Sequence, residues 1–262
     1  MRVAAAQISC SLGDLEANIT KIEQFTERGR SAGAELVVFP EMSDTGYAME
    51  TIRAQAQAWT SGAVPRLQKC AARLSIAIIC GVSQREKDRI YNSQVVIGHD
   101  GQILAQYRKT HLFKPAPIAE HTCFAPGDRL VDLPLGDFRA GLTICYDLRF
   151  PEIYRTLALE HRVDLFVLSS AWPFPRVEHF RTLALARAIE NQSYFISANR
   201  VGTDNGVTFC GSSAIIDPSG ATLAVAASEG EELLVADISM DPVRQVRSRM
   251  PVFEHRRADV YR

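Results

Sequence analysis

The sequence predicts an α/β protein in which two β-sheets pack together and are covered by helices. Short apolar runs with strand character alternate along the chain with stretches whose apolar residues recur at helical spacing. Pairs of strands joined by turn-forming residues lie between these units and indicate hairpins. The chain has 262 residues, of which 47% are hydrophobic, so it can bury a sizeable core as one domain spanning residues 1–262.

The first elements follow the order strand, helix, strand. We expect a strand over residues 2–10 and a helix over residues 14–30, which ends before Gly33. A short buried strand over residues 35–39 comes next. Glu41 stands just after the carboxyl end of that strand, so its carboxylate is delivered to the edge of the sheet.

Two helices, three strands and a loop make up the next part of the chain. The expected helices cover residues 48–59 and 64–74, and the expected strands cover residues 76–81, 91–97 and 102–107. The last two strands form a hairpin because residues 99–101 between them have turn chemistry. Lys109 stands at the end of the second arm. Residues 114–126 contain three prolines and no periodicity, which predicts a loop, and this loop carries Glu120.

A corner between a strand and a helix dominates the second half. An apolar strand over residues 138–144 stops at Cys145, and Pro151 opens a helix that runs to about residue 161. Cys145 therefore stands at the carboxyl end of a strand, with free backbone N–H groups just after it. The remaining elements are expected to be a helix over residues 177–191 and strands over residues 164–169, 194–198, 208–217, 221–226 and 232–238. Residues 241–262 form a basic tail with too little apolar content to fold alone, so we expect it to pack on the domain or on a partner subunit.

The charge balance restricts the class of ligand. The formal net charge is −1 with acidic and basic residues interspersed, so no basic face predicts binding to nucleic acid or to a membrane surface. The apolar runs are far shorter than a membrane span, and Met1 leads directly into the first strand. We therefore expect a soluble, cytoplasmic protein whose ligand is a small neutral or anionic molecule.

The six cysteines show no CxxC pair and no spacing with histidine that suits zinc. We interpret them as reduced thiols and expect neither a metal nor a cofactor. Packing explains most of them as small buried side chains, and this is also the alternative interpretation of Cys145.

Glu41, Lys109 and Cys145 together suit the hydrolysis of an amide. A thiol is mostly protonated at neutral pH, so a nucleophilic Cys145 needs a base, for which Glu41 is the candidate. Attack on the carbonyl creates an oxyanion, and Lys109 and the backbone N–H of Tyr146 are its candidate partners. Glu120 is the candidate second carboxylate, holding Lys109 and contacting the leaving nitrogen. Once ammonia has left, Glu41 can also take a proton from the water that hydrolyses the thioester.

Two other interpretations stay open on these residues. A cysteine–histidine pair would use His111 or His179, the two histidines beside the predicted site, although histidines in such places are more often structural. A protein that keeps the fold but only binds a small ligand is the other alternative.

Three motifs carry these residues and resemble those of the nitrilase superfamily of carbon–nitrogen hydrolases, and the resemblance runs from end to end. The motifs are Phe39-Pro40-Glu41, YRKTHLF at residues 107–113 and GLTICYDLRFPE at residues 141–152. The resemblance implies a four-layer αββα sandwich and the pairing of sandwiches into homodimers. It also implies the roles of base, oxyanion partner and nucleophile for Glu41, Lys109 and Cys145.

Details within the motifs narrow the implied substrate. Tyr146 and Asp147 follow the nucleophile where true nitrilases usually have Trp-Glu, which implies an amide substrate and not a nitrile. Residues 172–176, 186–192 and 199–203 look like those of bacterial ω-amidases. This implies hydrolysis of 2-oxoglutaramate or 2-oxosuccinamate to carboxylate and ammonia. An N-carbamoyl amine or a deaminated peptide amide on the same site is the alternative substrate.

A 2-oxo acid amide needs a partner for its carboxylate, and Arg176 is the candidate through bidentate pairing. Tyr47, Phe113 and Trp172 are the other candidate substrate-binding residues. Trp172 is expected to wall the pocket, and Tyr47 is a candidate for holding Glu41. We expect the corner to be braced by an ion-pair network of Asp147, Arg149 and Glu152.

Overall fold

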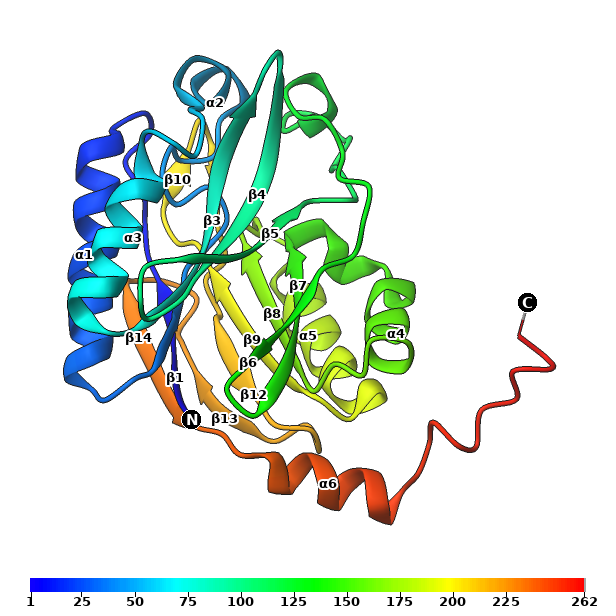
Figure 1. The fold of residues 1–262 in the computed structure, drawn as a ribbon. Coiled ribbons are helices and arrows are strands. Elements are labelled where there is room, and N and C mark those ends of the chain that lie inside the picture. The colour runs from blue at the N-terminus through cyan, green and yellow to red at the C-terminus, as the bar shows by residue number, and fades with distance from the viewer. Residues whose placement is uncertain (262) are drawn as a thin grey trace.

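A computed structural model gives the fold of residues 1–261. Two six-stranded sheets lie face to face, and helices cover both outer faces (Figure 1). The result is a four-layer αββα sandwich, which confirms the predicted fold class. None of the helices in these residues combines the length and the apolar character that a membrane crossing requires.

The first sheet has the strand order β14-β1-β2-β3-β4-β5. Its strands are β1 (Arg2–Gln7), β2 (Leu36–Val38), β3 (Ala77–Glu86), β4 (Arg89–Ile97), β5 (Ile103–Arg108) and β14 (Glu232–Asp237). The helices that precede β4 are α1 (Leu15–Ser31), α2 (Met49–Gln55) and α3 (Ala63–Leu74). Of these, α1 and α3 cover the outer face of the first sheet (Figure 1).

The second sheet has the order β13-β12-β9-β8-β7-β6. Its strands are β6 (Asp132–Leu135), β7 (Phe138–Ile144), β8 (Leu165–Ser170), β9 (Tyr194–Asn199), β12 (Ala214–Ile216) and β13 (Thr222–Val225). Its outer face is covered by α4 (Pro151–Leu159) and α5 (Val177–Asn191). A separate small hairpin joins β10 (Thr203–Asp204) to β11 (Val207–Thr208).

The core follows the alternation of side chains along the strands. On the first sheet, Ala4, Val37 and Ile78 pack against α1 and α3, while Val3 and Val38 point the other way. This second set joins the large cluster between the sheets. Because successive strand residues face opposite sides, one strand contributes to both apolar layers.

Three parallel strands form the centre of each sheet, β1-β2-β3 in the first and β7-β8-β9 in the second. The carboxyl ends of neighbouring parallel strands lie at the same edge, so the segments after them are brought together. Glu41 follows β2 and Ala171 follows β8, and the Ala171 N–H donates a hydrogen bond of 2.8 Å to Glu41 Oε2. The edges of the two sheets therefore meet at this point.

Several elements differ from the prediction. The expected strand over residues 208–217 is broken into β11 and β12, because Gly211 and Ser212 take positive φ values of +51° and +58°. Strand β3 runs on to Glu86 and pairs with β4 across a tight turn at Lys87, which has a φ of +54°. The end of β3 consists of polar residues, so the hydrophobicity pattern did not predict this part of the hairpin.

The chain after β14 begins with α6 (Met240–Arg249), which the tail's composition did not predict. Arg247 donates to the backbone oxygen of Val163, to Asp164 and to the hydroxyl of Ser193. Beyond α6, Gln192 Nε2 donates a hydrogen bond of 2.7 Å to the backbone oxygen of Met250.

Candidate active site

The residues predicted to carry the chemistry come from three strand ends. Glu41 follows β2, Lys109 follows β5 and Cys145 follows β7. All three side chains are buried, with exposed fractions of 0%, 1% and 7%. Two of these strands belong to the first sheet and one to the second, so the site lies where the sheets meet.

Lys109 lies between two carboxylates. Its Nζ is 2.9 Å from Glu41 Oε1 and 2.8 Å from Glu120 Oε1. Burial opposes the charge of Lys109, but the attraction of Glu120 and Glu41 outweighs this and raises the pKa of the lysine. The ammonium group therefore stays protonated at neutral pH. Glu120 lies in a short 3₁₀ turn, η1 (Glu120–Thr122), within the predicted loop.

Burial raises the pKa of Glu41, and Lys109 opposes this effect. Each Glu41 oxygen is held: Oε1 accepts from Lys109, and Oε2 accepts from the backbone N–H of Ala171. A carboxylate with a raised pKa and a fixed orientation suits the work of a general base.

Cys145 occupies the turn between β7 and a 3₁₀ segment, η2 (Cys145–Arg149). Its φ of +43° is unusual for a residue other than glycine, and such strain is often found at functional sites. Burial, followed by the negative charge of Glu41, raises the pKa of the Cys145 thiol well above its usual range. The resting thiol is therefore protonated, and its attack on a substrate requires a base.

Asp147 braces this corner by hydrogen bonds. It accepts from the Ile144 N–H at 2.9 Å, from the Tyr107 hydroxyl at 2.8 Å and from the His111 N–H at 3.1 Å. The Cys145 corner is thereby tied to the segment that carries Lys109. The predicted ion-pair network was wrong: within residues 1–261, neither Asp147, Arg149 nor Glu152 pairs with another member of that group.

The two candidate histidines are engaged elsewhere. His111 Nδ1 lies 3.0 Å from Asp147 Oδ1, and His179 Nδ1 lies 3.2 Å from a terminal nitrogen of Arg149. Among the hydrogen bonds of residues 1–261, neither ring contacts Cys145. The geometry therefore favours Glu41 over a histidine as the base.

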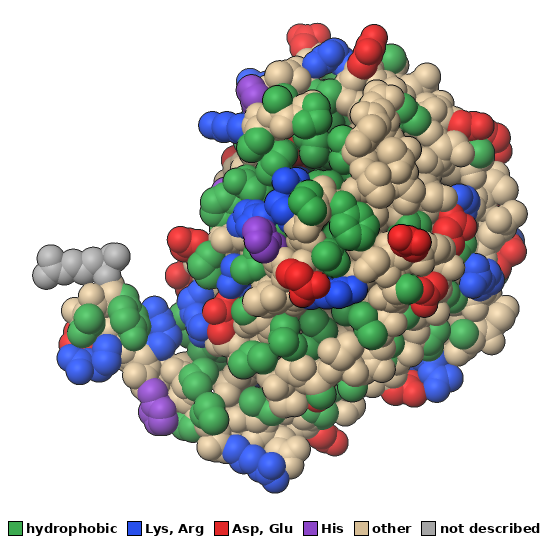
Figure 2. Space-filling view, turned by 180° about the vertical axis from the view of Figure 1, so that it is seen from behind, with side chains coloured by type: hydrophobic (Ala, Val, Ile, Leu, Met, Phe, Trp, Pro, Cys, Tyr) green, Lys and Arg blue, Asp and Glu red, His purple; other side chains and the backbone are tan. Residues whose placement is uncertain are grey.

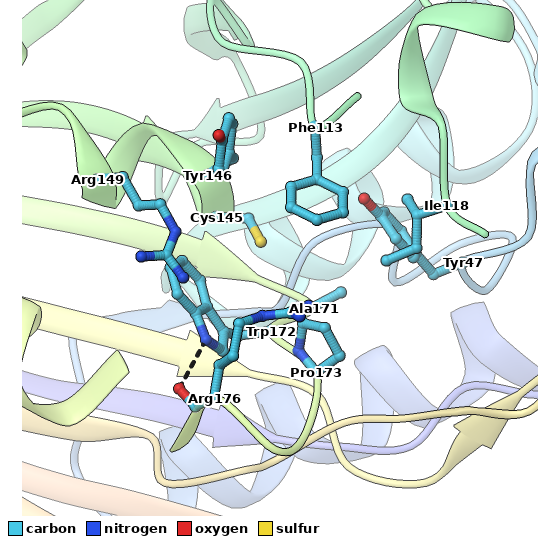
Figure 3. A pocket seen from close by; sticks show the side chains of 10 residues that line it. All are labelled: Tyr47, Phe113, Ile118, Cys145, Tyr146, Arg149, Ala171, Trp172, Pro173 and Arg176. Atoms are coloured by element: carbon cyan, nitrogen blue, oxygen red, sulfur yellow. Dashed lines mark hydrogen bonds between the residues drawn. The ribbon is translucent and has the colours of Figure 1, made fainter. Parts of the chain in front are cut away.

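A small pocket opens over the Cys145 sulfur, which faces the space between Phe113 and Trp172 (Figure 3). The four predicted substrate-binding residues are all in its wall. The full lining is Tyr47, Phe113, Ile118, Cys145, Tyr146, Arg149, Ala171, Trp172, Pro173 and Arg176. Apolar and aromatic walls with a few polar groups are typical of sites for small molecules.

Tyr47 lines the pocket but does not hold Glu41, so that prediction was wrong. Its hydroxyl donates to Glu120 Oε1 at 2.7 Å, and its backbone N–H donates to Asp204 Oδ2 at 2.7 Å. The sequence could not reveal this choice, because both glutamates were expected near the same lysine.

Arg149 is a pocket residue that the sequence analysis assigned to another role. Its guanidinium lies 4.7 Å above the Trp172 ring, and that of Arg176 lies 5.6 Å from the Phe113 ring. Burial lowers the pKa of Arg149, and the nearby positive charge of Arg176 acts in the same direction. Within residues 1–261, no aspartate or glutamate forms an ion pair with either guanidinium group.

The structure contains no group of three or more His, Cys, Asp or Glu side chains within residues 1–261 that is arranged to hold a metal ion. All six cysteines are free thiols.

The chain has relatives among known proteins. Residues 2–248 match the carbon-nitrogen hydrolase family. The chain is 35% identical over 260 residues to 2-oxoglutaramate amidase of Bacillus subtilis strain 168, an alignment that covers 99% of this chain and 98% of that protein. Human omega-amidase NIT2 is 31% identical over 252 residues, which cover 93% of this chain and 91% of that protein.

A solved structure adds a chemical parallel. The amidase from Nesterenkonia sp. AN1, in a variant with acrylamide added at its active-site cysteine, superposes with a TM-score of 0.85 at 28% identity. The match covers 97% of this chain and 99% of that one. The protein thus belongs to the carbon-nitrogen hydrolase family and is a hydrolase of carbon–nitrogen bonds other than peptide bonds.

Proposed function

We propose that the protein is an ω-amidase that hydrolyses the terminal amide of a small 2-oxo acid, such as 2-oxoglutaramate or 2-oxosuccinamate, through a cysteine thioester. The main observation behind this proposal is that Lys109 lies between Glu41 and Glu120, close enough to Cys145 for their charges to act on its thiol. The amidases among its relatives support the reaction class.

In the first half-reaction, Glu41 takes the thiol proton as the Cys145 sulfur attacks the carbonyl carbon. Lys109 and the backbone N–H of Tyr146 stabilise the oxyanion that forms. The carbon–nitrogen bond then breaks, and Glu41 returns its proton to the nitrogen, which leaves as ammonia. Glu120 keeps Lys109 in place and contacts the leaving nitrogen.

In the second half-reaction, water hydrolyses the thioester. Glu41 removes a proton from the water while the water oxygen attacks the thioester carbon. The carbon–sulfur bond then breaks. The proton returns to sulfur, so the products are a carboxylic acid and the free thiol. One base therefore serves both halves of the reaction.

The two arginines of the pocket support a substrate that carries a carboxylate. Arg149 and Arg176 face a largely apolar pocket, and no acidic side chain in residues 1–261 pairs with them. A carboxylate at the far end of a small substrate would supply the missing negative charge through paired hydrogen bonds. The same charges would repel the amine of an N-carbamoyl amine such as N-carbamoylputrescine.

Ammonia release from a panel of amides tests the proposal. We expect turnover with 2-oxoglutaramate and 2-oxosuccinamate, and much slower turnover with glutamine, N-carbamoylputrescine and butyramide. Replacing Arg176 by Gln should raise KM for the two oxo acid amides by about tenfold to hundredfold, because the substrate carboxylate loses a hydrogen bond to a charged group. The KM for butyramide, which has no carboxylate, should not change. Preference for N-carbamoylputrescine would support the alternative substrate class. No release from any amide would support a protein that only binds ligands.

We also propose that the enzyme is a cytoplasmic homodimer. Six free thiols, four of them at 7% or less of their full exposure, are consistent with a reducing compartment. The surface formed by α5, α6 and the chain after α6 carries exposed apolar side chains that a second subunit would cover.

A further inference from the structure

Asn92 lies beside the proposed catalytic groups, on β4 of the first sheet, between β3 and the edge strand β5. It pairs with Ser83 of β3 on one side, and its backbone oxygen accepts from the Lys109 N–H at 2.8 Å on the other. Its exposed fraction is 1%. Asn92 is thus fixed by the sheet next to the strand end that carries Lys109.

The side-chain amide of Asn92 donates to both carboxylates. Its Nδ2 is 2.6 Å from Glu41 Oε1 and 3.0 Å from Glu120 Oε1. These are the same two oxygens that accept from Lys109 Nζ, at 2.9 Å and 2.8 Å. Two donors, one neutral and one charged, therefore share one pair of oxygens.

The two donors are not equivalent. The lysine ammonium turns freely about its last bond, whereas the two N–H bonds of an amide lie in a fixed plane. Asn92 therefore specifies where the two oxygens lie relative to each other, which Lys109 alone does not. The amide also adds no charge to a cluster that already contains two carboxylates and one ammonium.

The other end of Asn92 is left without a partner. Its Oδ1 is buried and accepts no hydrogen bond from residues 1–261. A buried amide oxygen without a donor is unfavourable, so the residue is not placed for its own stability. The part of the side chain that acts in the site is the Nδ2 amide group, which donates to the two carboxylates.

We propose that Asn92 is a positioning residue that sets the spacing of the Glu41 and Glu120 oxygens around Lys109 and keeps Glu41 in place as the base. This inference rests on the proposed function. Burial raises the pKa of Glu41, Lys109 lowers it, Glu120 raises it, and the Asn92 hydrogen bond lowers it again. The other titratable groups that interact with this cluster are the Cys145 thiol, the Tyr47 hydroxyl and the buried guanidinium of Arg200, whose pKa the charge of Glu41 raises.

The test replaces Asn92 by Leu, which keeps the size of the side chain and removes the donors. We expect kcat to fall by about tenfold to hundredfold with little change in KM, as for a misplaced catalytic group. The acid limb of the kcat/KM profile should move to higher pH by about one unit, because Glu41 loses a hydrogen bond to its charged form. Asn92→Ser has a single hydroxyl that is too short to bridge both carboxylates, so the acid limb should shift in the same direction but less. This second variant tests the proposal if Asn92→Leu does not fold.

Asn191 provides a matched control. It is a buried asparagine whose Nδ2 donates to the backbone oxygen of Arg187 and whose Oδ1 likewise lacks a partner in residues 1–261, but it lies at the end of α5. Asn191→Leu should lower stability and leave the pH profile unchanged. An acid limb in both Asn92 variants that matches the wild-type limb would overturn the proposal.

A second readout does not depend on turnover. The rate at which iodoacetamide alkylates Cys145 should show the same upward shift of its acid limb in the Asn92 variants. If no amide is hydrolysed but this shift appears, the proposed substrate is wrong and the positioning role stands. If amides are hydrolysed and neither limb shifts, the positioning role is wrong and the proposed function stands.

Discussion

At the scale of single residues, the site combines a protonated thiol, the proposed nucleophile, with a carboxylate held in a fixed orientation, the proposed base. The buried thiol of Cys145 has a pKa raised by burial and by Glu41, so a free thiolate is not the resting state. Strain at a φ of +43° presents the sulfur to the pocket, but it does not ionise it. Reactivity should therefore depend on Glu41.

Alkylation of the thiols tests this dependence. Iodoacetamide should label Cys145 faster than Cys123, the half-buried thiol outside the pocket, with a rate that rises with pH as Glu41 loses its proton. This rise should begin above the usual carboxylate range, because burial raises the pKa of Glu41. Glu41→Gln should slow the labelling of Cys145 by about hundredfold, the usual contribution of a general base, and leave Cys123 unchanged. Equal rates at both cysteines would argue against an activated nucleophile. Peptide mass spectrometry gives both rates in one sample.

Removing the ammonium group tests the charge balance. Lys109→Met should abolish measurable turnover, because the oxyanion loses its cation. The variant also leaves Glu41 buried beside Glu120 without a counter-charge, so burial and the neighbouring carboxylate should raise the folded-state pKa of Glu41 above its unfolded value. A raised folded pKa gives stability that is present at acid pH and lost as pH rises. The free energy of unfolding should therefore fall below wild type by about 3–5 kcal/mol at pH 8 and by much less at pH 4. Urea unfolding at the two pH values measures it, and a loss that is larger at pH 4 would contradict the charge argument.

Sequence alone could place some of these residues and not others. Glu41, Lys109 and Cys145 each follow a short apolar strand, so their positions could be predicted from strand ends. Asn92 lies inside strand β4, and the sequence pattern does not distinguish a polar residue with a role in the site from one that is only half-buried in a sheet. Its role becomes visible once the Glu120 loop is seen to fold back over the end of β5. Arg149 lies in the pocket wall because of the turn of η2, and the sequence pattern did not predict that turn. It was therefore assigned to the corner.

At the scale of secondary-structure elements, the close approach of β3 to the segment after β2 fixes the position of Glu41, the proposed base. Gly81 in β3 lies against the turn after β2, and a Cβ there would be 2.5 Å from the Pro40 oxygen and 2.6 Å from Glu41 Cα. The neighbouring atoms belong to the backbone, so a side chain at this position has to displace the Glu41 segment.

Gly81→Ala is therefore expected to impair catalysis without touching the substrate. A shift of Glu41 by a fraction of an ångström to one ångström should lower kcat/KM by about tenfold to hundredfold, and overpacking should lower stability by about 1–3 kcal/mol. Gly230→Ala is the control, since its Cβ would meet nothing within 4 Å, although its φ of +88° also makes alanine unfavourable. Steady-state kinetics and thermal unfolding separate the two effects. Equal activity in both variants would show that the Glu41 turn tolerates displacement.

Several elements were predicted at or near their observed bounds. The helix over residues 177–191 was placed at its observed bounds as α5, although its buried face combines Phe180 and Ala184 with the polar residues Arg187 and Asn191. The strand over residues 208–217 was not, because its apolar content hides a bend at Gly211 and Ser212, which both take positive φ values. Local pattern describes burial well, but it does not report positive φ values at residues other than glycine.

At the scale of the whole molecule, the site requires both sheets. Glu41 and Lys109 come from the first sheet and Cys145 from the second, and Asp147 links the Cys145 corner to the segment of Lys109. We therefore propose that residues 1–262 act as one catalytic unit. Residues far apart in the sequence converge because parallel strands in each sheet end at the same edge.

The far side of the molecule carries the proposed subunit contact. Ile189 of α5 and Met250 after α6 have exposed fractions of 47% and 61%, and both line a groove between α5, α6 and the following chain. Figure 2 shows the described chain after α6, up to residue 261, standing out from the body, with hydrophobic and basic side chains on it. Exposed apolar side chains of this kind favour a protein interface.

Solution mass tests this contact. We expect light scattering after gel filtration to give a dimer for the wild type. Ile189→Glu, which buries a charge at the proposed interface, should give a monomer at micromolar concentration, since an unpaired buried charge costs several kcal/mol of association energy. Leu104→Glu is the matched control: Leu104 is also an exposed apolar residue, at 50%, but it belongs to β5, an edge strand of the first sheet, whereas α5 covers the second sheet. A dimer in both variants would move the contact away from α5. Because the groove is lined by α5, α6 and the following chain while the pocket lies at the ends of the strands, Ile189→Glu should change the mass without changing the substrate preference.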